Sequence, residues 1–155
     1  MNILLTNDDG YEARGIKLLK EKLQKYGQVT VVAPRDFMSA KSCSLTIRDG
    51  LEFKKREARV FSLSGFPADC VAFALSSLNT DFDLVVSGCN HGLNISYDTL
   101  YSGTIGACLE AVLHHKKSIA FSCAMNFEVV EEHFDEVMDF IEKKGLLSTD
   151  YFFKC

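Results

Sequence analysis

The sequence lacks a long hydrophobic run, which argues against a membrane-spanning segment. Its longest uncharged stretch, Leu84 to Tyr97, is interrupted by Ser, Gly, Asn and His residues and falls short of the roughly 20 apolar residues that a spanning helix needs. The apolar run at the N-terminus is too short for a signal peptide and ends at Asp8 and Asp9. We therefore expect a soluble, cytoplasmic protein with no membrane partner.

The sequence also has no block of basic residues. Its 17 Lys and Arg residues are outnumbered by 21 Asp and Glu residues, giving a formal net charge of -4. A groove that follows a nucleic-acid backbone needs clustered positive charge. We therefore expect no nucleic-acid polymer as a partner.

Two common motifs are missing as well. None of the six cysteines forms a Cys-x-x-Cys pair, so we expect buried, reduced thiols in place of a zinc site or disulfides. No Gly-x-Gly-x-x-Gly follows the first apolar segment, where only Gly10 and Gly15 occur. This absence argues against the main alternative, a Rossmann-type dinucleotide-binding protein.

The apolar segments that are present predict an α/β fold. With 155 residues, of which 47% are hydrophobic, the chain is long enough for one domain over residues 1–155. Contiguous apolar runs predict buried strands, and apolar residues spaced three and four apart predict helices. Their alternation predicts a Rossmann-like three-layer sandwich with a mostly parallel sheet. The predicted strands are 2–7, 28–33, 84–87 and 118–122, with short β-like runs at 44–47, 51–53 and 60–63 that suggest antiparallel excursions at the sheet edge. The predicted helices are 13–26, one beginning at Pro67, one beginning at Thr104, and 127–144.

Two adjacent carboxylates, Asp8 and Asp9, follow the first predicted strand, and Gly10 allows an immediate turn. Neighbouring acids repel each other unless a cation lies between them. Oxygen ligands suit Mg²⁺ or Mn²⁺, so the pair indicates a metal site. The alternative is that one acid caps the next helix while the other is solvated.

Polar loops also follow two other predicted strands, and in a parallel sheet all three loops open at the same edge. One contains Ser39, and another runs from Gly88 to Gly103 through Asn90 and Asn94. This second loop leads into Ser102, Gly103 and Thr104 at a predicted helix start, where free backbone N–H groups favour an anion. Beside a dicarboxylate site, these residues suggest a phosphate pocket, although such a tripeptide alone is commonly only a cap.

Five segments in this order resemble the SurE (survival protein E) family. They are Asn-Asp-Asp-Gly at 7–10, Ser-Leu-Thr at 44–46, Pro-Ala-Asp-Cys-Val at 67–71, Val-Val-Ser-Gly-x-Asn-x-Gly-x-Asn at 85–94 and Leu-Tyr-Ser-Gly-Thr at 100–104. Members of this family are metal-dependent phosphatases of 5′- and 3′-nucleoside monophosphates. The resemblance implies one Mg²⁺ or Mn²⁺ per subunit, bound by Asp8, Asp9, Ser39 and Asn90. It also implies that the substrate phosphate lies near Asn94, Ser102, Gly103 and Thr104.

The reaction expected from this resemblance is hydrolysis by a metal-activated water, with Asp8 or Asp9 as the catalytic carboxylate. An aspartyl-phosphate route is the alternative, but enzymes that use it show Asp-x-Asp where this chain has Asp-Asp.

The chain departs from the family pattern in two places. Arg35 and Asp36 are exchanged relative to the family's order, and Ala40 replaces a glycine. The chain is also shorter than family members, so the C-terminal part of the fold is expected to be missing. A catalytically weak or silent member that binds metal and phosphate is therefore the alternative function.

The shorter chain also bears on assembly. The apolar tail after 127–144 predicts an exposed patch and a homodimer or higher homo-oligomer. The alternative is that the tail adds a strand to the sheet.

Overall fold

The computed structural model describes residues 1–124 and 126–155. Their strands form one sheet in the order β3-β4-β2-β1-β5-β6-β7, in which every neighbouring pair is parallel except β3 and β4. The strands are β1 (Asn2–Thr6), β2 (Gln28–Pro34), β3 (Phe53–Glu57), β4 (Val60–Leu63), β5 (Leu84–His91), β6 (Lys117–Cys123) and β7 (Phe153–Lys154).

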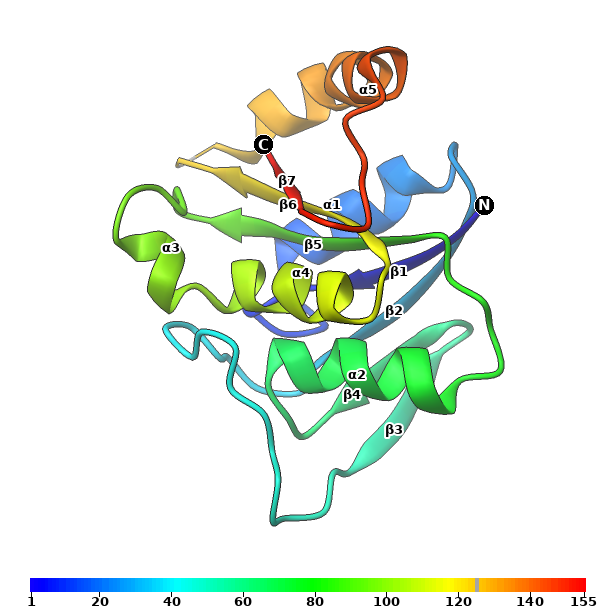
Figure 1. The fold of residues 1–155 in the computed structure, drawn as a ribbon, viewed down its shortest axis with the longest axis vertical. Helices are drawn as coiled ribbons and strands as arrows, with labels where there is room; N and C mark the ends of the chain where they lie inside the picture. The colour runs from blue at the N-terminus through cyan, green and yellow to red at the C-terminus, as the bar shows by residue number, and fades with distance from the viewer. Residues whose placement is uncertain (125) are drawn as a thin grey trace.

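Helices cover both faces of this sheet, so the molecule has three layers (Figure 1). On one face, α1 (Arg14–Leu23) and α5 (Phe127–Lys144) pack over a core that includes Ile3 and Leu5 of β1. On the other, α2 (Pro67–Ser77) and α4 (Gly103–Leu113) pack over a core that includes Leu4. Successive residues of a strand point to opposite faces, which is why the three central residues of β1, Ile3, Leu4 and Leu5, are all apolar. The predicted Rossmann-like, mostly parallel α/β sandwich is confirmed.

Most predicted elements occur within a few residues of the expected bounds, and α5 has the predicted bounds of 127–144. The predicted strand at 44–47 is wrong, because the backbone N–H and hydroxyl of Thr46 donate to the side chain of Asp69 and not to a neighbouring strand. The sheet excursion at 51–63 is the antiparallel pair β3–β4, with β3 at the outer edge.

The third segment that differs is the loop predicted at 88–103. After an irregularity between Ser87 and Asn90, β5 resumes pairing with β6 and continues to His91. A short helix, α3 (Asp98–Tyr101), then precedes α4. The loop between β5 and α3 is thus shorter than the loop that the Gly/Asn-rich composition suggested.

The apolar tail does not form the exposed patch that we expected. Its end is β7, which pairs with β6 through Ile119↔Phe153 and Ala120↔Lys154. Leu146 and Leu147 pack against the core beneath α1 and α5, while Tyr151 is exposed. The alternative, a tail that adds a strand to its own sheet, is therefore what the structure shows.

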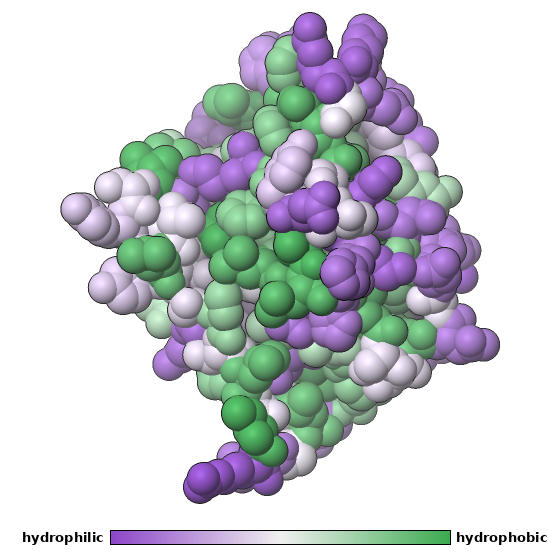
Figure 2. Space-filling model, viewed as in Figure 1, coloured by the Kyte–Doolittle hydropathy of each residue, from purple (hydrophilic) through white to green (hydrophobic). Residues whose placement is uncertain are grey.

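Exposed apolar side chains gather elsewhere, over α3 and α4, whereas the surface around α5 is mostly hydrophilic (Figure 2). Leu100 of α3 and Leu109 and Leu113 of α4 are all exposed. The outer edge of the sheet has a different character, because four of the five residues of β3 are exposed and charged, in the order Lys-Lys-Arg-Glu.

Candidate functional site

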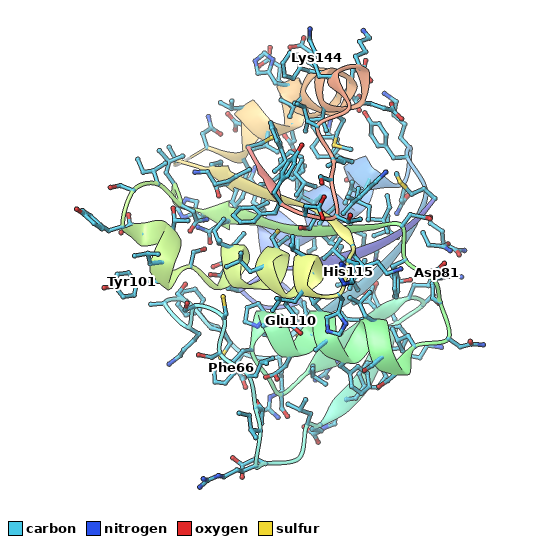
Figure 3. All side chains as sticks on the ribbon, viewed as in Figure 1. Phe66, Asp81, Tyr101, Glu110, His115 and Lys144 are labelled. Carbon is cyan, nitrogen blue, oxygen red and sulfur yellow. The ribbon has the colours of Figure 1, made fainter. Side chains whose placement is uncertain are left out.

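The candidate site lies where β1, β2 and β5 end, at the edge that Tyr101 marks in Figure 3; Asp81 and His115 mark the opposite edge. The turn after β1 is held by the buried side chain of Asn7. Asn7 Nδ2 donates to the carbonyl oxygen of Gly10 at 2.9 Å, and the backbone N–H of Gly10 donates to Asn7 Oδ1 at 3.2 Å. Gly10 has φ 100, a conformation that favours glycine. This closed turn presents Asp8 and Asp9 at the strand end.

Asp8 is held against the first turn of α4. Its side chain is 3% exposed, and its Oδ1 accepts a hydrogen bond from Thr104 Oγ1 at 2.7 Å. A Cβ on Gly103 would lie 2.9 Å from Asp8 Cβ and 3.3 Å from Asp8 Oδ2. Glycine at 103 therefore lets the helix start approach the carboxylate.

Burial raises the pKa of both carboxyl groups. For Asp8, the charge of Asp9 adds to the effect of burial, and the hydrogen bond from Thr104 acts against it. For Asp9, the backbone N–H and the ring charge of His91 act against burial. Each carboxylate is thus costly in its charged form, and a bound cation would offset that cost.

A cavity of about 210 Å³ opens beside Asp8. Five of the described residues that line this cavity were expected to bind metal or phosphate: Asp8, Ser39, Asn90, Asn94 and Ser102. The other described lining residues are Ala40, His91, Asp98 and Tyr101. Asp9, Gly103 and Thr104 are not on its wall in the described part of the chain. The cavity therefore brings together side chains from three loops that are far apart in sequence.

Thr104 and Ser102 both have partners within the protein. The side chain of Thr104 is fully buried, and its hydroxyl hydrogen is donated to Asp8. Ser102 is the N-cap of α4, with its Oγ accepting from the backbone N–H of Ile105 at 3.2 Å. Both hydroxyls thus fix the helix start beside the cavity.

The side-chain amides of the two asparagines, one near the end of β5 and one after it, are each held by a hydrogen bond. Asn90 Nδ2 donates to the carbonyl oxygen of Gly92 at 2.8 Å, an arrangement that leaves its Oδ1 available as a neutral oxygen ligand. Asn94 Nδ2 donates to Ser122 Oγ at 2.8 Å. The Asn90 amide therefore has the chemistry of a metal ligand, and the Asn94 amide is bonded to β6.

Two of the five segments that resemble the SurE family bind each other. Asp69 Oδ1 accepts the backbone N–H of Thr46 at 2.9 Å, and Asp69 Oδ2 accepts the Thr46 hydroxyl at 2.7 Å and the backbone N–H of Phe66 at 2.9 Å. Ser42, on the same loop, donates its hydroxyl to the carbonyl oxygen of Leu100 at 2.8 Å. These bonds hold the loop that carries Ser39 against α2 and α3.

The donors near the cavity suit a hard cation. They are two carboxylates, one hydroxyl and one amide, and oxygen donors of this kind are preferred by Mg²⁺ and Mn²⁺. Residues 1–124 and 126–155 contain no cluster of three or more His, Cys, Asp and Glu side chains suited to a metal. The oxygen donors near the cavity therefore have the chemistry that Mg²⁺ and Mn²⁺ prefer.

Sequence reasoning gave no role to His91, which lies beside Asp9 and lines the cavity. Its ring centroid is 5.6 Å from that of Phe127, and the guanidinium of Arg14 lies 5.3 Å from the same Phe127 ring. The position next to Asn90 within the 85–94 segment was the available signal. Asp98 and Tyr101 were missed as well, because α3 was not predicted.

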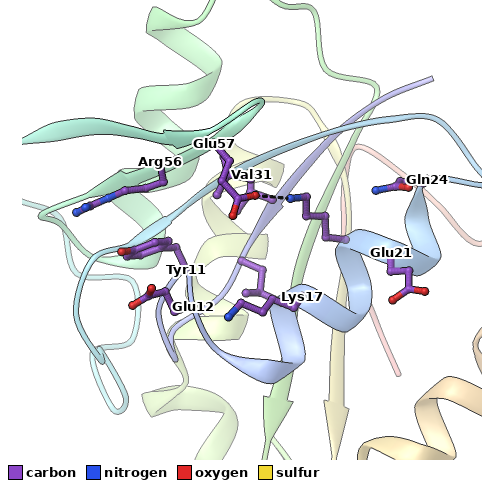
Figure 4. A pocket seen from close by; sticks show the side chains of 11 residues that line it. Tyr11, Glu12, Lys17, Glu21, Gln24, Val31, Arg56 and Glu57 are labelled. Carbon is purple, nitrogen blue, oxygen red and sulfur yellow. Dashed lines mark hydrogen bonds and ion pairs between the residues drawn. The ribbon is translucent and has the colours of Figure 1, made fainter.

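A larger cavity, of about 330 Å³, lies outside this site between α1 and the β3–β4 pair (Figure 4). Lys20 Nζ and Glu57 Oε2 pair across it at 3.1 Å. The guanidinium of Arg56 lies 4.9 Å from the centroid of the Tyr11 ring. Four of the side chains that line this cavity are thus engaged with one another.

Across the part of the chain that the structure describes, no helix combines the length and apolarity needed to cross a membrane.

Comparisons with known proteins identify the family of the chain. The family model described as survival protein SurE matches residues 3–151. Two relatives called 5′-nucleotidase SurE, from Clostridium botulinum strains Alaska E43 and Eklund 17B, are 42% and 40% identical over 94% and 92% of this chain.

A solved structure, the SurE protein from Aquifex aeolicus, superposes with a TM-score of 0.84 at 36% identity and covers 92% of this chain. The chain spans 63% and 59% of the two Clostridium relatives and 59% of the Aquifex protein. The match extends through nearly all of this sequence, and the chain therefore belongs to the survival protein SurE family.

Proposed function

We propose that residues 1–155 form a single phosphatase domain that hydrolyses phosphate monoesters, with nucleoside 5′- and 3′-monophosphates as substrates. One observation carries the proposal: Asp8 lies beside a cavity that Ser39, Asn90, Asn94 and Ser102 also line. The naming of two relatives as 5′-nucleotidases supports the substrate class. Activity on 3′-monophosphates rests on the family resemblance alone.

We propose Asp8, Asp9, Ser39 and Asn90 as the ligands of one Mg²⁺ or Mn²⁺ per subunit. When bound, such an ion would supply positive charge toward the phosphate oxygens and make water more acidic. The raised pKa values of Asp8 and Asp9 support this assignment, because each carboxylate gains when a cation offsets its burial.

In the proposed reaction, Asp8 and Asp9 have different tasks. Asp8 is buried and fixed by Thr104, which suits it to hold a constant position. Asp9 is less buried, which suits it to orient the attacking water and accept its proton. Asn94, Ser102, Gly103 and Thr104 would hold the phosphate at the N-terminus of α4, where the helix dipole favours an anion. The hydroxyl of Thr104 is itself bonded to Asp8.

Phosphate release from a panel of nucleoside monophosphates, with Mg²⁺, Mn²⁺ or EDTA, tests this proposal. We expect release with a divalent ion and none with EDTA. Undiminished release with EDTA would contradict the metal assignment. No release from a folded sample that still binds Mn²⁺ and inorganic phosphate would favour the silent binding protein. An acid-stable or trapped phosphoenzyme would favour the aspartyl-phosphate route over direct water attack.

The same proposal includes a cytoplasmic location, supported by six free cysteines, and a homodimer or higher homo-oligomer. Because the tail folds onto β6, it does not form an exposed apolar patch for self-association. The proposal is supported by an exposed apolar surface on α3 and α4, formed by Leu100, Leu109 and Leu113. Sedimentation of the intact chain and of Leu113→Lys tests the interface. A wild-type monomer at tens of micromolar concentration would count against it.

A further inference from the structure

The last strand places a lysine next to a residue that lines the candidate site. Lys154 Nζ donates to the backbone carbonyl oxygen of Asn94 at 2.5 Å, across 60 positions of sequence. The backbone of β7 fixes this contact. Lys154 pairs with Ala120 of β6, and the N–H of Cys155 donates to the carbonyl oxygen of Ala120 at 2.8 Å.

The residue that accepts this hydrogen bond is itself well held. Asn94 is buried, its side chain donates to Ser122 at 2.8 Å, and its carbonyl oxygen also accepts from Thr99 Oγ1 at 3.1 Å. Asn94 lines the cavity that Asp8 and Ser102 share. The ammonium group of the half-buried Lys154 therefore lies against a residue of the cavity wall, although Lys154 is not itself a lining residue.

This ammonium group has a neutral partner, as Lys22 does, whereas four other lysines have carboxylate partners. Lys20, Lys25, Lys54 and Lys116 each form an ion pair with an acidic side chain. Within residues 1–124 and 126–155, no carboxylate lies within 4.0 Å of Lys154 Nζ under the criterion that identifies those pairs. A lysine ammonium has three N–H donors, and the bond to Asn94 uses one. Two donors and a positive charge thus remain next to Asn94, beside a cavity whose acidic lining residues, Asp8 and Asp98, repel an anion.

We propose that Lys154 is an anion-binding residue of this site, which donates to a phosphate oxygen of the substrate beside Asn94. The inference rests on the proposed phosphatase function and adds a cation, supplied by the last strand, to the phosphate contacts. Its physical role is to offset the repulsion between a phosphate dianion and the acidic residues of the cavity. A charge-assisted hydrogen bond to phosphate is among the stronger polar contacts available to a protein.

Three variants of the full 155-residue chain test the role of the charge. Lys154→Met keeps the aliphatic stem and removes the ammonium, and Lys154→Arg keeps a cation. Lys117→Met is the matched control, because it removes the same charge from an exposed position at the start of β6, at the opposite edge of the sheet. Calorimetric titration of inorganic phosphate into Mn²⁺-loaded protein is the measurement. We expect Lys154→Met to weaken phosphate binding about tenfold, Lys154→Arg to restore most of it, and Lys117→Met to match the wild type.

Mn²⁺ titration of the same proteins separates binding from a purely structural role. If Lys154 only holds the loop after β5, its loss would disturb Asn90 as well as Asn94 and weaken the affinity for both Mn²⁺ and phosphate. If its charge binds phosphate, Lys154→Met weakens phosphate binding and leaves Mn²⁺ affinity unchanged or tighter, because a positive charge near the dication has been removed.

Unchanged phosphate affinity in Lys154→Met, or parallel loss of Mn²⁺ and phosphate affinity, would overturn the inference. Failure of the proposed function looks different. In that case the wild type releases no phosphate from any nucleotide, whereas phosphate binding still distinguishes Lys154→Met from Lys117→Met.

Discussion

Thr104 donates its hydroxyl hydrogen to Asp8 across 2.7 Å, joining the first turn of α4 to the end of β1. The two residues are separated by 96 positions in the sequence. Because this bond opposes the effect of burial on the pKa of Asp8, it helps keep the carboxylate charged.

Replacing Thr104 by Val removes this donor while keeping the side chain's shape. We expect the pKa of Asp8 to rise further, Mn²⁺ affinity to fall, and unfolding to become about 1–3 kcal/mol easier, since a buried acceptor loses its partner. Thr104→Ser retains a hydroxyl and is the control. Urea unfolding and Mn²⁺ titration measure both effects, and equal behaviour of the Val and Ser variants would contradict the role of the hydrogen bond.

The four proposed metal ligands are expected to differ in strength. Asp8→Asn and Asp9→Asn remove a full negative charge, so each should lower Mn²⁺ affinity and activity sharply. Ser39→Ala and Asn90→Ala remove only a neutral dipole and should cost less. The Asn variants should also fold as well as the wild type or better, because one member of a repelling pair is gone. Normal Mn²⁺ affinity with lost phosphate binding in Asn90→Ala would move that residue to the substrate.

Gly103→Ala should displace Asp8 without any backbone strain of its own. The new Cβ would lie 2.9 Å from Asp8 Cβ, which is too close for packed atoms, and 3.1 Å from Pro67 Cγ, which is a tight contact. We expect a loss of about 1–3 kcal/mol in the free energy of unfolding and weaker Mn²⁺ binding. Gly50→Ala is the control, since nothing lies within 4 Å of its added Cβ. Full activity of Gly103→Ala would mean that the approach of α4 to Asp8 is not required.

Thr46→Val should loosen the loop that carries Ser39. It removes the hydroxyl bonded to Asp69 Oδ2 while leaving the backbone N–H bond to Oδ1. We expect faster proteolysis at 39–50 and a loss of about 1 kcal/mol in stability. Thr46→Ser preserves the hydroxyl and should resist proteolysis like the wild type; equal cleavage of all three proteins would exclude this anchoring.

Acid should weaken the contact between α5 and the loop after α1. Asp135 accepts from Tyr26 Oη at 2.7 Å and pairs with Lys25 at 3.0 Å, and these partners hold its pKa below the ordinary value of 3.8. A carboxyl group whose pKa is lowered by folding stabilises the protein fully at a pH above its unfolded-state pKa. This contribution is lost as the pH falls through the folded-state pKa.

Urea midpoints at pH 6 and pH 3 measure this loss. Asp135→Asn should be less stable than the wild type at pH 6 and should lose less on acidification. Asp139→Asn, an exposed position on the same helix, should follow the wild type. An identical pH response of Asp135→Asn and the wild type would contradict the linkage.

The sheet and its helices could largely be predicted from local patterns. Contiguous apolar runs identified β1, β2 and β6, and apolar spacing identified α5, because burial on two faces or on one stripe leaves a direct mark on the sequence. The 44–47 segment has the same local character as a strand. Its backbone partner is a side chain 23 positions away, which no local pattern contains.

The candidate site could be predicted only to the level of its loops. Parallel topology alone brings the ends of β1, β2 and β5 to one edge, which is why Asp8, Ser39 and Asn90 were expected together. The contacts of single side chains were beyond this reasoning. The commitment of the Thr104 hydroxyl to Asp8 and the reach of Lys154 to Asn94 depend on packing between elements far apart in sequence.

The charged outer edge of β3 affects how the folded protein behaves in concentrated solution. An open strand edge offers unpaired backbone groups to a second molecule, but pairing here would bring together the exposed Lys54, Lys55 and Arg56 of both copies. Repulsion between like charges opposes such a sheet-to-sheet contact. Replacing these three cations by uncharged β-formers would thus be expected to promote fibrous precipitation even where the fold itself is intact.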